Sequence, residues 1–165
     1  MFIKRLNYFF LFITILGSIF LIYSWYENYQ FKNNPLNEDI QKKIQEKKQY
    51  LEVLSYKKFN IKRKIPVIIS DKLPSNLFGA ATFSKDGEIQ IFLNKKRFQE
   101  SVSYMIDDVL PHEYAHALMF IYGDTSDENG GHSLKWQKIC KSLNGLRCDR
   151  FVDHNDIIVG KTSFF

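Results

Sequence analysis

The sequence is poor in cysteine: its 165 residues include only two, Cys140 and Cys148. Two cysteines cannot supply a four-cysteine zinc ribbon, so the sequence indicates no structural metal site of that kind. The pair could form a disulfide in an oxidising compartment or stay reduced in the cytosol, and the sequence leaves both open. Internal repeats are also missing. A chain of this length, 45% hydrophobic and 25% charged, can build one modest domain around a core.

Charged residues are missing from the stretch between Leu6 and Tyr26, which is 21 residues long. A helix of that length spans a bilayer core, and Tyr8 and Trp25 lie where interfacial aromatic residues are expected. A cleavable signal peptide is the alternative, because basic residues precede the stretch. However, the apolar run is long and no small-x-small cleavage site follows it. We therefore predict a membrane anchor over residues 1–28, a linker over residues 29–36 and one domain over residues 37–165.

The orientation of this anchor depends on the basic residues at its two ends. Lys4 and Arg5 on a very short tail favour a cytoplasmic N-terminus, which would export the rest of the chain. Lys32, Lys42 and Lys43 on the other side argue for the opposite orientation. We expect a single-pass protein of the bacterial inner membrane with an exported domain, and a cytoplasmic domain is the alternative.

Positive charge is concentrated in one segment, although the chain carries only +5 overall. Between Lys42 and Lys64 there are nine Lys or Arg residues against two Glu, a local balance of +7. A basic segment of this kind could bind nucleic acid or anionic lipid headgroups. Such a run is more often the solvated face of a helix, and we favour that interpretation.

The first half of the predicted domain is expected to form a helix followed by strands. Asn37 is a typical N-cap for a helix that reaches about Lys58. Pro66 indicates the start of a strand or a strand at a sheet edge. The expected strands cover residues 65–69, 78–83 and 88–94. The turn Ser84–Gly87 joins the last two strands into a β-hairpin.

The second half of the domain is mainly helical. Helices are expected over residues 95–110, 111–123 and 133–143, with a polar loop over residues 124–131. Pro111 is tolerated at the first position of a helix, so it can open the second of these helices or kink a longer one. Gly123 is a natural C-cap. Together the elements predict an α+β domain after an N-terminal transmembrane helix.

The pentapeptide His112-Glu113-Tyr114-Ala115-His116 carries the clearest chemical signal in the chain. Positions i and i+4 lie on one face of a helix, so both imidazoles can reach one metal ion. Glu113 lies one residue further round, close to a water on that metal but poorly placed to be a ligand. Zinc suits imidazole nitrogen, and three protein ligands with one water is its usual catalytic arrangement. An amphipathic core helix with two incidental histidines is the alternative.

A catalytic zinc needs a third ligand, and three residues are candidates. His132 is favoured because Gly130 and Gly131 allow a sharp turn and His132 then opens a helix facing the first. Glu128 is a carboxylate in a loop, and His154 lies in a polar tail without a positioning element. The metzincin spacing would require histidine at position 122, where this chain has Tyr122, so that class is excluded.

Two segments of the chain resemble the SprT-like zinc metallopeptidases, relatives of Spartan. The segments are Val109–Leu118 and Gly131–Trp136, with fifteen residues between His116 and His132. The resemblance covers about residues 36–150. It implies a small gluzincin-like core: a helix, a three-stranded sheet with a β-hairpin, an HExxH active-site helix and a third-ligand helix. Three features depart from the family pattern. Ser133 replaces a common glycine after the third histidine, and the C-terminal zinc ribbon of many members is missing. An N-terminal membrane anchor is also not typical of the DNA-repair members.

The resemblance implies zinc-dependent hydrolysis of peptide bonds. The metal ligands would be His112, His116 and His132, and Glu113 would be the general base and then the general acid. A protein or peptide substrate would lie extended beside the hairpin strand. The oxyanion-stabilising residue stays open; Tyr114 and Tyr122 are available, although core or surface roles suit both better.

Two rival functions remain at this point. In the first, the domain is a non-catalytic binding module whose zinc is structural or missing, and the intact Glu113 argues against it. In the second, the protein is a nucleic-acid-associated protease like Spartan, with the segment from Lys42 to Lys64 as its binding surface. The second requires a domain that faces the cytoplasm. The sequence does not indicate the natural substrate or the oligomeric state.

Overall fold

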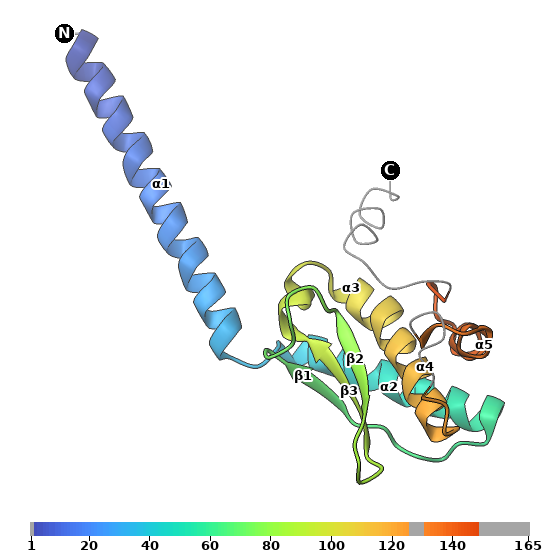
Figure 1. Ribbon diagram of the computed structural model, residues 1–165. Helices are drawn as coiled ribbons and strands as arrows, with labels where there is room; N and C mark the ends of the chain where they lie inside the picture. Colours follow the sequence, from blue (N-terminus) through green and yellow to red (C-terminus); the bar gives the residue numbers. More distant parts are fainter. Residues whose placement is uncertain (1, 126–130, 149–165) are drawn as a thin grey trace. The chain divides into compact units, whose positions relative to one another are not determined.

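The structure is a computed structural model that describes residues 2–125 and 131–148 (Figure 1). The chain divides into two compact units, Met1–Leu36 and Asn37–Phe165. The first unit consists of one long helix. The second unit contains a three-stranded sheet and the remaining helices, and it carries the candidate site. The two other candidates for the third ligand, Glu128 and His154, lie outside the described residues.

The long helix α1 (Phe2–Asn33) has no polar face. Its segment Ile3–Asn33 has a mean hydropathy of 2.0 and is long and apolar enough to cross a membrane, by length and composition alone. A signal sequence near an N-terminus would meet the same criteria. The large apolar side chains along the helix are exposed, as expected for a surface in contact with lipid. The helix continues to Asn33, so helical backbone extends into the stretch predicted as a linker.

Helix α2 (Glu38–Phe59) opens the second unit and begins as the sequence predicts. The Asn37 side-chain oxygen accepts a hydrogen bond from the Asp39 backbone N–H at 2.8 Å, which satisfies one of the free donors at the helix start. The helix buries Ile44 and Leu51 and leaves most of its lysines at the surface. It ends where Asn60 adopts a left-handed conformation, with φ of 55°.

The sheet is mixed and has the order β1-β3-β2. Strand β3 (Ile89–Asn94) is central, and Ile89, Ile91 and Leu93 are buried on one face as their alternation predicts. Strand β2 (Gly79–Phe83) pairs with it antiparallel through the predicted hairpin. Strand β1 (Val67–Ser70) pairs with β3 in parallel and lies at the edge. That position agrees with the proline that precedes it, because proline cannot donate to a strand ladder.

The helical region between the sheet and the pentapeptide differs from the single helix predicted over residues 95–110. It starts with a 3₁₀ turn, η1 (Lys95–Gln99), and then breaks. The Ser101 hydroxyl caps the next helix by accepting the backbone N–H of Tyr104 at 3.2 Å. From there the helical backbone runs without a break through α3 (Val102–Tyr104), the π turn η2 (Met105–Val109) and α4 (Leu110–Ile121).

The π turn explains how a proline fits inside this long helical run. Pro111 has no backbone N–H and its ring crowds the carbonyl one turn earlier, which would normally end or kink a helix. In η2 the backbone N–H of Leu110 donates to the carbonyl of Met105, five residues back. This wider turn accommodates Pro111 at the start of α4.

Helix α5 (Leu134–Ser142) packs against α4 and starts at Ser133, whose hydroxyl accepts the Trp136 backbone N–H at 3.3 Å. In Figure 1, α4 lies between the sheet and α5. Beyond α5 the chain turns back, and Cys140 and Cys148 form a disulfide. The structure therefore decides a pairing that the sequence left open.

Candidate metal centre

The two histidines of the pentapeptide face the same side of α4. Their imidazole centroids are 5.1 Å apart, as expected for positions one helical turn apart. His112 is 3% exposed, and His116 is partly buried. The helix is held between β2 and β3 on one side and α5 on the other, so this face looks into the interior of the domain. The local sequence alone produces this half of the site.

His132 joins the two histidines from a different part of the chain. Its Nε2 lies 3.1 Å from Nε2 of His112 and 3.3 Å from Nε2 of His116. The three residues form a group whose potential ligand atoms all lie within 4.8 Å of one another. Nitrogens at about 2.0–2.1 Å from a tetrahedral zinc would be roughly 3.3 Å apart. The donor set and its spacing therefore fit a zinc ion.

The backbone before His132 turns sharply, as the glycines there predict. Gly131 has a backbone φ of 82°, a conformation that residues other than glycine rarely adopt. A Cβ atom on Gly131 would also lie 3.3 Å from Cε1 of His116. Gly131 thus allows both the turn and the close approach of this segment to the second histidine.

The environment keeps the histidines in the neutral form that binds metal. Burial, with a smaller contribution from His132, lowers the pKa of His112 to about 4. Burial, with smaller contributions from the other two histidines, lowers the pKa of His116 to about 3. Metal ions compete with protons for imidazole nitrogen, so neutral rings at pH 7 are the binding-competent form.

A backbone carbonyl orients one of these rings. Nδ1 of His112 lies 3.4 Å from the carbonyl oxygen of Arg147. A carbonyl oxygen can only accept, so Nδ1 carries the proton and Nε2, which faces the other histidines, keeps its lone pair. Sequence reasoning missed this contact because a backbone carbonyl has no signature in the sequence.

The indole of Trp136 contacts all three imidazoles. Its centroid lies 4.7 Å from that of His112, 4.9 Å from that of His116 and 4.4 Å from that of His132. The ring stacks on His116 at an interplanar angle of 28° and meets the other two rings edge to face. Trp136 is completely buried, so it forms a rigid wall behind the three rings.

Glu113 lies against the outer edge of β2. Its carboxylate accepts a hydrogen bond from the backbone N–H of Ala81, and its side chain is 6% exposed. A Cβ atom on Gly79 would lie only 2.8 Å from Cγ of Glu113, so glycine leaves the space that this side chain occupies. Burial raises the pKa of the Glu113 carboxyl to about 8, and the bond from Ala81 opposes that shift. A metal dication nearby would favour the ionised carboxylate.

Among the residues that the structure describes, no strand pairs with the outer edge of β2, the edge that faces away from β3. The bonds from Asn94 N–H to the Phe78 carbonyl (2.8 Å) and from Ser84 N–H to the Glu88 carbonyl (2.9 Å) mark the pairs that face β3. Because such pairs alternate along an antiparallel ladder, the backbone groups of Gly79, Ala81 and Phe83 point away from β3. This outer edge of β2 therefore runs directly past Glu113.

A comparison with protein families gives a match to the SprT-like family over residues 28–155. The chain belongs to the SprT-like family. A comparison with curated proteins gives no match, and a comparison with solved structures gives none either. SprT-like proteins are generally metallopeptidases, so family membership and the histidine cluster point to the same chemistry. The family resemblance and the α+β fold predicted from the sequence are confirmed.

The SprT-like match begins near the end of α1, so most of the apolar helix precedes the family region. Within that region, Ser133 occupies the position after the third histidine, where the resemblance led us to expect glycine. Its φ of −58° and ψ of 163° are accessible to any residue, and its hydroxyl caps α5. The substitution therefore needs no rearrangement of the approach to that helix.

The two tyrosines considered for oxyanion stabilisation each contact another part of the domain. Tyr114 is completely buried with its hydroxyl beside Ser55 of α2, and burial raises its pKa to about 12. Tyr122 is 45% exposed and its ring lies 5.1 Å below the ammonium group of Lys135. Both positions agree with the core and surface roles that the sequence favoured.

Proposed function

We propose that this protein is a zinc-dependent metallopeptidase that hydrolyses peptide bonds in protein substrates. The observation that carries the proposal is the convergence of His112, His116 and His132 within 4.8 Å, beside a glutamate on the same helix. A structural zinc site has no use for a carboxylate at that position, whereas a hydrolytic site requires one. Membership of the SprT-like family supports the same reaction.

The side chains would divide the work as follows. His112, His116 and His132 would hold the zinc through Nε2, which leaves a fourth position free. When bound, zinc lowers the pKa of water and polarises the scissile carbonyl. Glu113 would accept a proton from the attacking water and pass it to the leaving amine. Its bond from the Ala81 N–H and the space at Gly79 keep the carboxylate at the edge of β2.

The substrate would bind as an extra strand on the open edge of β2. Glu113 already accepts the Ala81 N–H and Gly79 is buried, so an extended peptide would pair with the Ala81 carbonyl and the outward groups of Phe83, antiparallel or parallel. Such pairing uses only main-chain atoms, so it provides affinity with little sequence preference. It would also bring the scissile bond past the Glu113 carboxylate.

The test of the catalytic proposal is Glu113→Gln in the full chain. Glutamine has the same shape but cannot take the proton, so hydrolysis of fluorescent casein should fall by at least about 100-fold. Zinc content, measured by mass spectrometry, should stay near one ion per chain. As a matched control, Glu52→Gln in α2 should leave both quantities unchanged. Hydrolysis unaffected by Glu113→Gln would exclude this carboxylate as the general base.

For the cellular location, we propose that α1 is a membrane anchor and that the domain lies on the exported side of the membrane. The helix is long and apolar enough to span a bilayer, and the Cys140–Cys148 disulfide suits an oxidising compartment. On α2, Lys47 pairs with Asp107 at 2.9 Å and Lys48 lies 3.8 Å from Glu52, so two lysines of the basic segment already have acidic partners, as expected if the segment is an ordinary helix face. These contacts favour that interpretation over the nucleic-acid surface of a Spartan-like protease.

The orientation can be measured with reporter fusions at the C-terminus. Alkaline phosphatase is active only after export and green fluorescent protein folds well only in the cytoplasm. We expect an active phosphatase fusion and a dark fluorescent fusion, both in the membrane fraction. The reverse pattern would place the domain in the cytoplasm and reopen the nucleic-acid alternative. A fusion recovered in the soluble exported fraction would identify α1 as a cleaved signal sequence.

A further inference from the structure

The chain beyond α5 forms a short loop that is closed on itself. We call residues Leu143–Cys148 the clasp loop. The disulfide joins its last residue to Cys140 in the final turns of α5, and the two Cα atoms are 5.6 Å apart. Gly145 crosses over the bridge, where a Cβ atom would lie 2.6 Å from Sγ of Cys140 and 2.9 Å from Sγ of Cys148. The loop therefore fits tightly around the two sulfur atoms.

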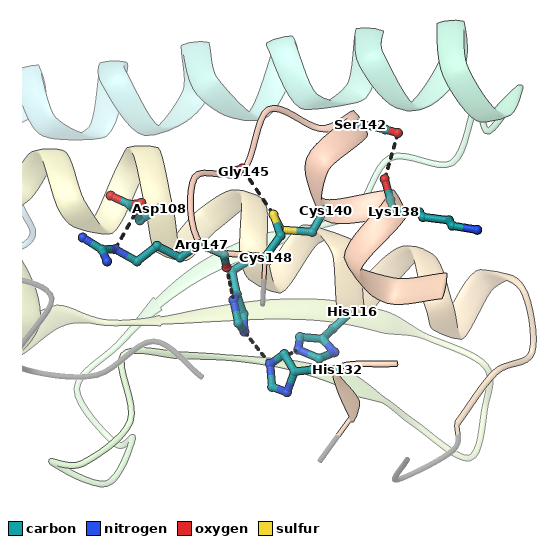
Figure 2. Close-up of a disulfide and its surroundings, with 10 residues drawn as sticks. Asp108, His116, His132, Lys138, Cys140, Ser142, Gly145, Arg147 and Cys148 are labelled. Atoms are coloured by element: carbon teal, nitrogen blue, oxygen red, sulfur yellow. Dashed lines mark hydrogen bonds and ion pairs between the residues drawn. A yellow bond between two sulfur atoms is a disulfide. The ribbon is translucent and has the colours of Figure 1, made fainter. Parts of the chain in front are cut away.

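Two further contacts hold the clasp loop in place. At its start, the Asn144 side-chain amide donates to the Tyr50 hydroxyl of α2 at 2.5 Å. Near its end, Nε of Arg147 lies 3.8 Å from a carboxylate oxygen of Asp108 in the π turn. Figure 2 shows Arg147 between the disulfide and the histidines, with its side chain directed toward Asp108. The loop is thus tied to α5, to α2 and to the helix that leads into the HExxH segment.

The consequence of this attachment is a fixed carbonyl oxygen. Arg147 precedes Cys148 directly, so the disulfide restricts the peptide group that joins them. The Arg147 carbonyl lies 3.4 Å from Nδ1 of His112 and can only accept from it. With the proton held at Nδ1, the lone pair of Nε2 faces His132, whose Nε2 is 3.1 Å away. The contact selects the tautomer that a metal needs.

We infer that the clasp loop is a positioning element for the candidate metal centre. Through the Arg147 carbonyl it holds His112 in the Nδ1–H tautomer and in the ring orientation that directs Nε2 to the other histidines. The disulfide keeps that carbonyl in place, so opening the bridge weakens metal binding without touching a ligand. Arg147 is a positioning residue and not a catalytic one. The expected effect on metal affinity rests on the proposed zinc function. The effect on the His112 tautomer does not depend on that function.

The effect expected of such a partner is substantial. Hydrogen-bond partners of metal-ligating histidines typically contribute about 10- to 100-fold to metal affinity. We therefore expect the double variant Cys140→Ala with Cys148→Ala to bind zinc about 10- to 100-fold more weakly, as measured by competition with a chromogenic chelator. Arg147→Ala retains the backbone carbonyl and the disulfide and removes side-chain contacts such as those with Asp108 and the Tyr104 ring, so a smaller reduction is expected.

The decisive measurement is the tautomer of His112 in the zinc-free full chain in detergent micelles. Long-range ¹H–¹⁵N NMR correlations distinguish Nδ1–H from Nε2–H imidazoles directly. In the oxidised wild type we expect His112 as the Nδ1–H tautomer. In the double alanine variant, and in wild type reduced with a phosphine, we expect a mixture of tautomers. Reoxidation of the reduced wild type should restore the single form.

Ile65→Ala provides the matched control, because it removes a buried side chain beside β1 and leaves the clasp loop unchanged. It should lower thermal stability without altering the His112 tautomer or the zinc affinity by more than about twofold. An unchanged tautomer and unchanged affinity after loss of the disulfide would overturn the inference. Equal losses in the double variant and in Ile65→Ala would also overturn it, since a general loosening would then explain both.

The same data separate this inference from the proposed function. A wild type that takes up no zinc would remove the metallopeptidase proposal, while the NMR measurement would still decide whether the loop orients His112. A wild type that binds one zinc, with affinity and tautomer independent of the disulfide, would keep the enzyme and remove the positioning role.

Discussion

At the scale of single residues, the position of Glu113 depends on the absence of a side chain at Gly79. The Cγ atom of Glu113 packs against Gly79 of β2, and a Cβ atom at position 79 would lie 2.8 Å from that Cγ atom. The next outward-facing backbone group, the Ala81 N–H, then donates to the carboxylate. The glutamate is therefore held by the edge strand as much as by its own helix.

Gly79→Ala tests this arrangement. The new methyl group would displace Glu113 because Cγ and Cδ are both in its way, at 2.8 and 3.2 Å. A displacement of about 1 Å at a catalytic group can cost roughly 100-fold in rate. We expect kcat on a peptide substrate to fall by about 10- to 100-fold while zinc affinity changes by less than about threefold.

Ala80→Gly on the same strand is the comparison for Gly79→Ala, because it changes the strand without adding an atom beside Glu113. It should keep most of the activity. A Gly79→Ala variant with wild-type kcat would mean that the carboxylate does not need this position. A parallel loss of zinc and activity would instead indicate a general disturbance of α4.

At the scale of elements, β2 and α4 form the two walls of the candidate site. Helix α4 supplies two imidazoles and the carboxylate, and β2 supplies an open edge whose outward groups alternate with those paired to β3. A peptide bound to such an edge would present alternate N–H groups to the strand and the others to solvent. Recognition of this kind depends on the backbone of the substrate.

Backbone N-methylation of a cleaved peptide measures this dependence. Each methyl group removes one N–H donor and adds bulk on that side of the strand. Scanned one residue at a time on the same side of the scissile bond, the methyl group should raise KM by about 10-fold or more at alternate residues. The intervening residues should show changes of less than about threefold, and they serve as internal controls. A scan without a two-residue period would contradict binding as an added strand.

At the scale of the whole molecule, the candidate metal centre joins segments that are far apart in the sequence. The metal would connect α4 to the chain entering α5, and the disulfide connects α5 to the clasp loop. Each link restrains the same part of the domain. Zinc binds the folded arrangement far better than an unfolded chain, so binding free energy becomes stability of the folded state.

Thermal unfolding of the second unit should therefore depend on zinc. At free zinc about 1,000 times its Kd, the expected gain is about 4 kcal/mol, which corresponds to about 10–15 °C in Tm for a domain of this size. Differential scanning calorimetry of the full chain, with a chelator and with buffered zinc, gives the shift. His132→Ala should remove most of it. A Tm that is independent of zinc in the wild type would exclude a site of this strength.

The sequence by itself determined the features that depend on short-range rules. Helical spacing brought His112 and His116 to one face, period-two alternation and a Gly-ended turn specified the hairpin, and Asn37 marked the start of α2. An uncharged run identified the apolar helix. His132 was also predicted to join the site, because a glycine pair and a helix start are local signals. Its role as a ligand, like that of Glu113 as the base, stays a prediction.

Tertiary structure alone decided the contacts that depend on which distant surfaces pack together. The sequence contains two cysteines but does not show whether they pair. In the structure, the chain after α5 packs so that Cys140 and Cys148 form a disulfide. The π turn before Pro111, the parallel pairing of β1 and the space at Gly79 arise in the same way. The Arg147 carbonyl is the clearest case, since every residue has one and only the folded chain selects which of them reaches His112.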